Sequence, residues 1–253
     1  MRQILYLTVI FGLTFFQNSW AYCDCPEFNP QTSISAWYDK IIKAEKGTNI
    51  NKFAYHFAYN HLPILIDESL VDEAFKIIKM DRPIKSQFGF ILLSGLYSKC
   101  PKFKGKIISE INNAANNPHS NFYNTSLEMF FYDSNLELSG LKLNENDDFD
   151  QVIKLVIFAR NEKKIENYKK LVGFLKKFES VKIIEDQREN FASECAQELI
   201  EVGSLGRIGL TVYHYKYFDL AKTIFKRTLE NPFGLDPDSV REAKYGIEKF
   251  KKR

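Results

Sequence analysis

The 253-residue sequence has few of the residues that interrupt regular structure or bind metals, with 12 Gly, 8 Pro, 4 Cys and 4 His. Because 45% of its residues are hydrophobic, the chain is neither disordered nor collagen-like. The formal net charge is only +3, and so weak a field gives no reason to expect a nucleic acid as the partner. Common catalytic patterns, such as H-E-x-x-H, G-x-S-x-G, the P-loop and G-x-G-x-x-G, are missing. We therefore predict no catalytic residue, no cofactor and no bound metal, which leaves only rare types of enzyme open.

The N-terminal segment has the pattern of a secretory signal peptide. Arg2 precedes an apolar stretch over 4–16, and Ser19-Trp20-Ala21 places small residues at the first and third positions before a cleavage site. The apolar stretch is shorter than the about 20 residues that a membrane-spanning helix needs, which disfavours an uncleaved anchor. We therefore expect residues 1–21 to be removed, the mature protein to be exported to the periplasm or beyond, and no membrane span to remain.

The four cysteines all follow this cleavage site: Cys23, Cys25, Cys100 and Cys195. An even number of cysteines in an exported chain favours disulfides. A bridge within Cys23-Asp24-Cys25 would close a strained small ring, so we predict that each of these two cysteines pairs with a distant one, in either order. A metal site is the alternative, but no C-x-x-C spacing supports it.

Apolar residues recur every three or four positions along most of the chain, which predicts amphipathic helices. Upstream of the middle, the predicted helices lie at about 33–46, 53–58, 67–78, 84–97, 101–116 and 118–133. Downstream, they lie at about 152–159, 165–178, 187–202 and from 236 to the C-terminus. Asn146 or Asp147 is the expected cap of the first downstream helix.

Residues 136–143 interrupt the helical pattern. Leu136-Glu137-Leu138 and Leu141-Lys142-Leu143 alternate with period two around Ser139-Gly140, which is typical of a hairpin. In that register Glu137 faces Lys142 and the four leucines share the other face. This pattern predicts a short β-hairpin at about 135–143, with a surface loop as the alternative.

The spacing of eight residues in the final third resembles one tetratricopeptide repeat, a 34-residue pair of antiparallel helices: Leu205, Ile208, Gly209, Val212, Phe218, Ala221, Phe225 and Pro232. The resemblance implies that small residues at Gly209 and Ala221 let the two helices approach closely. It covers only about 205–232, and Leu205 replaces the usual Trp. One such unit is too few for a repeat array, which needs about three to close a core.

Together these patterns predict an all-α fold, an α-solenoid-like stack of antiparallel helix pairs with one short β-hairpin at about 135–143. The length allows one domain or two. We expect a single helical domain over 22–253, or two halves, 30–132 and 147–253, joined by the hairpin and the acidic stretch after it.

Few residues suggest a functional site. His56, His61, Asp67 and Glu68 come nearest to a metal or acid–base cluster, although histidines at helix ends explain them as well. Six lysines, Lys163, Lys164, Lys169, Lys170, Lys176 and Lys177, are interpreted as a solvated helix face rather than a basic patch. Asn124-Thr125-Ser126 matches the acceptor sequence for N-glycosylation.

The predicted binding surface consists of Tyr213, Tyr215 and Tyr217 together with His214. Tyrosine side chains give large and rigid contacts to peptides or proteins. Positions two apart on a helix point about 200° apart, so only part of the set can line one surface, and core packing is the alternative.

From these features we predict an exported, non-enzymatic protein that binds another protein or an extended peptide. An immunity or inhibitor protein of the periplasm is one version of this hypothesis. The alternative is a hydrolase or metal-dependent enzyme of unrecognised type that uses His56, His61 and Asp67.

Overall fold

The computed structural model describes residues 68–78, 89, 93, 96, 97, 101–133, 135–178, 187–232 and 235–252, with only the backbone for 68–70. Several sequence-based predictions lie outside these residues: the signal peptide, the helices at about 33–46 and 53–58, and Cys23, Cys25, Cys100, His56, His61 and Asp67. These stay predictions.

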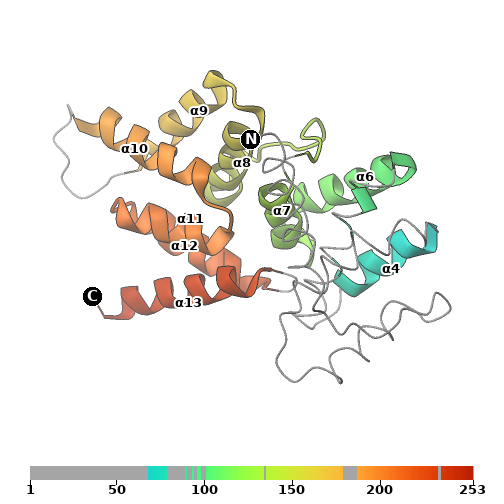
Figure 1. The fold of residues 1–253 in the computed structure, drawn as a ribbon. Helices are drawn as coiled ribbons and strands as arrows, with labels where there is room; N and C mark the ends of the chain where they lie inside the picture. The colour runs from blue at the N-terminus through green and yellow to red at the C-terminus, as the bar shows by residue number, and fades with distance from the viewer. Residues whose placement is uncertain are drawn as a thin grey trace, which may run out of the picture.

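Every regular element in the described residues is a helix, which confirms the predicted all-α fold (Figure 1). The elements are α4 (Glu68–Ile78), the 3-10 turn η2 (Pro101–Phe103), α6 (Lys104–Ala115), α7 (Tyr123–Tyr132), α8 (Asp148–Glu162), α9 (Ile165–Leu175), α10 (Arg188–Glu201), α11 (Leu205–His214), α12 (Phe218–Glu230) and α13 (Pro237–Lys251). The predicted helices over these ranges are confirmed, with ends shifted by a few residues. Within the described residues no helix is both long enough and apolar enough to cross a membrane.

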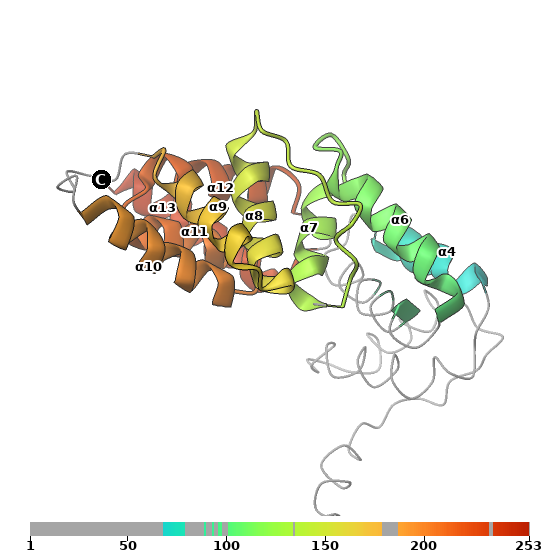
Figure 2. The same ribbon diagram turned by 90° about the horizontal axis from the view of Figure 1, so that it is seen from above.

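The helices form stacked pairs. Figure 2 shows α6, α7 and α8 following one another in chain order, with α9 to α13 beyond them. Helix α9 packs on α8, and α10 packs on both of them and on α11. Helices α11, α12 and α13 pack mutually, and α12 also contacts α8. Adjacent helices therefore cover each other's apolar faces, as in a solenoid.

Three of these helices have an N-cap residue whose side chain accepts hydrogen bonds from the first turn. The Asp147 carboxylate accepts from the amides of Phe149 at 3.0 Å and Asp150 at 3.2 Å, so Asp147 is the cap of α8. Ser204 caps α11 in the same way, and Asp236 caps α13 with Pro237 in the first turn.

The α11–α13 unit packs around the ring of Phe225. A Cβ on Gly209 would lie 2.4 Å from this ring, and one on Gly246 would lie 2.2 Å from it. Gly206 comes equally close to the backbone of α13, since its Cβ would lie 2.2 Å from the carbonyl oxygen of Ser239. The close approach that the tetratricopeptide resemblance implies at Gly209 is thus present, whereas membership of that family stays a prediction.

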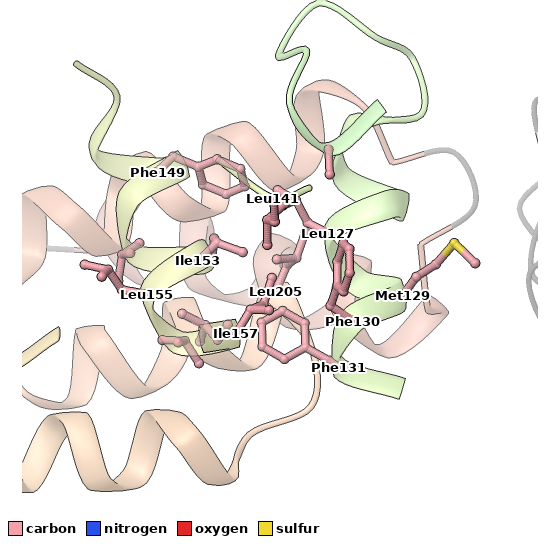
Figure 3. Packing of buried hydrophobic residues seen from close by; sticks show 14 of the residues in the cluster. Leu127, Met129, Phe130, Phe131, Leu141, Phe149, Ile153, Leu155, Ile157 and Leu205 are labelled. Carbon is pink, nitrogen blue, oxygen red and sulfur yellow. The ribbon is translucent and has the colours of Figure 1, made fainter. Parts of the chain in front are cut away.

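A continuous apolar core joins α7, α8 and α11. Figure 3 shows Leu127 and Phe130 of α7 facing Ile153 of α8, with Leu205 of α11 in the same space. Leu141, from the segment before α8, closes this space. All five side chains are buried.

The predicted β-hairpin at 135–143 is wrong, because these residues form turns and irregular backbone. The Asn116 side chain takes the place of a cross-strand partner: its Nδ2 donates to the Gly140 carbonyl at 2.7 Å, and its Oδ1 accepts from the Lys142 amide at 2.9 Å. Leu136, Leu138 and Leu141 are buried against the helices, so the alternating pattern reflects docking of a loop rather than a strand.

Candidate functional site

The four residues of the predicted binding surface do not share one surface. Tyr215 and Tyr217 are buried, and both rings contact Phe191 of α10, with centroids 5.0 and 5.9 Å away. Tyr213 is half-buried with its ring edge-on to Phe250 of α13 at 5.2 Å. Only His214 is exposed. The binding role of these residues stays a prediction, and their rings serve mainly to join α11 to its neighbours.

The two buried tyrosines keep their phenolic protons at neutral pH. Burial, with the hydrogen bond to Glu198 next in weight, raises the pKa of Tyr215 to about 12. Its hydroxyl donates to the Glu198 carboxylate at 2.9 Å. Burial also raises the pKa of Tyr217. Both rings therefore act as neutral packing groups between α10 and the α11–α12 turn.

Cys195, on α10, has a free and buried thiol in this structure. Burial raises its pKa, with Glu198 adding to the effect, so the thiol stays protonated at neutral pH. Its two predicted candidate partners, Cys23 and Cys25, lie outside the described residues, as does Cys100, and the disulfide pairing therefore stays a prediction.

A concave surface in the described residues lies where the C-terminal ends of α8 and α10 meet the start of α9. This α8–α10 cleft has a volume of about 860 Å³. Its charged lining residues are Arg160, Lys163, Lys164 and Glu201, and its walls include Ile165 and Tyr168. Three cations thus face one carboxylate, so the cleft is positively charged.

Each cation has a different setting. Arg160 donates a hydrogen bond to the Val202 carbonyl, which fixes the guanidinium beside the end of α10. Lys164 lies 3.2 Å from the Glu162 carboxylate. Lys163 ends α8 in the left-handed conformation, at φ 52°, and its exposed ammonium has no carboxylate partner within the described part of the chain.

The apolar wall of the cleft is rigid on one side and open on the other. The Tyr168 hydroxyl donates to the Ser193 carbonyl of α10 at 2.8 Å, which ties α9 to α10. Ile165, in contrast, is 68% exposed at the first position of α9. An exposed Ile next to two unneutralised cations is a combination suited to a ligand with both apolar and acidic groups.

Elsewhere, charged groups are buried and paired inside the molecule. Lys154 and Asp150 of α8 form an ion pair at 2.7 Å, and both side chains are 1% exposed. Tyr123 donates to Asp150, and Lys154 donates to the Lys142 carbonyl at 2.6 Å. Burial lowers the pKa of Lys154, and burial followed by the Asp150 charge raises the pKa of Tyr123. This Lys154 network fastens the loop before α8 to α7 and α8.

Glu128 of α7 is a second buried charge, 1% exposed. Its carboxylate accepts from the Asp236 amide at 2.8 Å and the Leu205 amide at 3.3 Å, at the starts of α13 and α11. Ser239 donates to it as well, while burial outweighs these bonds and raises its pKa to about 7. Glu128 therefore joins the starts of α11 and α13 to α7, and it is not among the residues that line the α8–α10 cleft.

The glycosylation sequence at Asn124 is not accessible in the folded protein. Asn124 is 2% exposed, and its Nδ2 donates to the carbonyls of Arg227 at 2.8 Å and Asn231 at 3.2 Å. The amide nitrogen that would carry a sugar is thus bonded to the C-terminal end of α12.

Among the described residues, no group of three or more His, Cys, Asp or Glu side chains is placed to hold a metal ion. The predicted cluster of His56, His61 and Asp67 lies outside these residues. The cleft itself was missed from sequence, because its walls come from three helices. The available signal was Lys163-Lys164 at a turn between two helices, followed by an Ile that begins the next one. No family model, curated protein or solved structure matches the chain.

Proposed function

We propose that this protein is an exported, non-enzymatic binding protein that holds another protein or an extended peptide in the α8–α10 cleft. The observation that carries this proposal is the exposed Ile165 beside Arg160 and Lys163 in a concave surface of about 860 Å³. Exposed apolar side chains rimmed by charged ones are typical of protein-binding surfaces.

The scaffold under this cleft supports binding without large rearrangement. Leu171 and Val172 of α9 and Ile157 of α8, the helices that line it, are buried in the core, and the Tyr168 hydroxyl is hydrogen-bonded to α10. A surface built on packed helices holds its side chains with little loss of entropy when a partner binds.

Site-specific photo-crosslinking in the producing cell tests the proposal. Ile165 is replaced by the photoreactive amino acid p-benzoylphenylalanine, and Tyr245 of α13, which is 51% exposed outside the cleft, is the matched control position. We expect a discrete crosslinked species from position 165 that is missing from position 245. Identical patterns from both positions, or no adduct from either, would contradict the proposal.

The proposed export has its own test. Mass spectrometry of the protein recovered from the producing cells should show loss of residues 1–21, with Tyr22 at the new N-terminus. Recovery of the uncleaved chain from the cytoplasm would contradict the proposed export and would not affect the proposed binding in the α8–α10 cleft.

A further inference from the structure

We infer that the α8–α10 cleft recognises an acidic peptide segment, with carboxylates opposite Arg160 and Lys163 and an apolar side chain against Ile165. This inference rests on the proposed binding function and adds the chemistry of the partner.

The first observation is the positive charge of the cleft. Arg160 and Lys163 form no ion pair within the described part of the chain, and only Lys164 shares its charge with a nearby carboxylate, that of Glu162. A concave surface with low-dielectric walls concentrates the field of such cations and attracts carboxylates. The protein as a whole is nearly neutral, so the attraction is local to the cleft.

Arg160 supplies geometric selectivity as well as charge. One of its guanidinium nitrogens donates to the Val202 carbonyl, which holds the planar group in place. The remaining N–H donors form a fork that matches the two oxygens of a carboxylate. An Arg that is already oriented loses less entropy when it binds such a group.

The apolar wall favours a peptide over a polyanion. Ile165 is two-thirds exposed, and Tyr168 lines the same cleft, so a ligand that buries apolar surface here gains from both. Glu201 also lines the cleft and repels any anion beside it, so the carboxylates of the ligand have to lie on the side of Arg160 and Lys163. In a peptide of the type Glu-Glu-Leu-Glu-Glu, the carboxylates can lie against Arg160 and Lys163 while the apolar side chain contacts Ile165.

Fluorescence anisotropy with the purified chain tests this inference. The probes are the labelled peptides Glu-Glu-Leu-Glu-Glu, Gln-Gln-Leu-Gln-Gln and Lys-Lys-Leu-Lys-Lys, measured at low and at high salt. We expect the acidic peptide to bind at least about tenfold more tightly than the other two, with a preference that decreases as salt screens the charges.

Two variants place the effect in the cleft. Arg160→Gln with Lys163→Gln should weaken binding of the acidic peptide about tenfold. Lys163→Glu alone should have a similar effect, and since Lys163 is exposed and has no ion-pair partner in the described residues, this variant keeps the fold. Lys222→Gln with Lys226→Gln removes the same charge from the exposed face of α12, outside the cleft, and should change affinity less than about twofold.

The outcomes separate this inference from the proposed function. Equal binding of the three peptides, or an equal loss in the α12 control, overturns the acidic specificity, and the proposed function then depends on crosslinking from position 165 alone. Binding of vesicles that contain phosphatidylglycerol, lost in Lys163→Glu without any peptide binding, overturns it in favour of a membrane surface. No crosslinking and no peptide binding overturn both.

Discussion

The α11–α13 unit and the region around α7 and α8 are held together by opposite means. In the first, Gly206, Gly209 and Gly246 let backbones and the ring of Phe225 approach closely. In the second, Lys154 and Asp150 are buried as a charged pair that reaches into a loop. The comparison shows that one chain can hold its helices together either by close packing or by buried polar contacts. Close packing should be sensitive to added volume, and the buried polar contacts should be sensitive to loss of a charge.

The largest expected effect comes from breaking the Lys154 network. Lys154→Met removes the ammonium and leaves the Asp150 carboxylate buried without its counter-ion, so the free energy of unfolding should decrease by ~3–5 kcal/mol. Urea denaturation followed by circular dichroism measures this change. The control is Arg241→Met, which breaks an ion pair on the surface of α13 with Asp238 and should leave stability unchanged. Equal effects of the two variants would show that the network contributes no more than a surface pair.

The next effect concerns Glu128, which connects the two regions. Its pKa in the folded protein is raised to about 7 from 4.5, so between these values the folded state binds a proton that the unfolded state has released. This group therefore contributes stability that is present below pH 4.5 and is lost as pH increases toward 7, by up to ~3 kcal/mol. Urea denaturation midpoints measured between about pH 4.5 and 7 compare the stability of wild type with that of Glu128→Gln. The difference between the two proteins should decrease with increasing pH. A difference that stays constant with pH would contradict the raised pKa.

A smaller loss is expected from the glycine contacts. A methyl group at Gly206 would lie 2.2 Å from the Ser239 carbonyl, a backbone atom that cannot move aside without shifting α13. Gly206→Ala should therefore reduce stability by ~1–3 kcal/mol. Gly173→Ala is the matched control in α9, where an added Cβ meets nothing within 4 Å, and it should instead stabilise by ~0.5–1 kcal/mol. Thermal melts of both variants measure the two signs.

The smallest expected effect is a gain at the turn between α11 and α12. Lys216 has a φ of 63°, in the left-handed region that favours glycine. Lys216→Gly should raise the free energy of unfolding by ~0.5–1 kcal/mol. The same substitution at Lys222, inside α12, should lower it by ~1 kcal/mol, and a gain at both positions would refute the role of the turn.

The sequence was sufficient to predict the helices because their apolar residues repeat locally. Asp236 was recognisable as a helix start for the same reason, and Asp147 was one of two candidates with Asn146, since capping depends on neighbours two or three residues away. The α11–α12 pair was likewise visible in the spacing of its small and apolar residues.

The errors come from contacts between residues far apart in the sequence. The hairpin pattern at 135–143 was misleading because Asn116 and Lys154, outside the segment, supply its hydrogen bonds. The burial of Tyr215 and Tyr217 depends on Phe191 of another helix. The α8–α10 cleft required three helices to be placed together, which local periodicity does not specify.

The burial of Asn124 has a consequence for producing this protein. A host with a eukaryotic secretory pathway attaches sugars to Asn-x-Ser sequences that are accessible before the chain has folded. A sugar added at that moment would occupy the position that the carbonyls of Arg227 and Asn231 need. Yields from such a host should therefore depend on leaving this asparagine unmodified, and bacterial expression avoids the difficulty altogether.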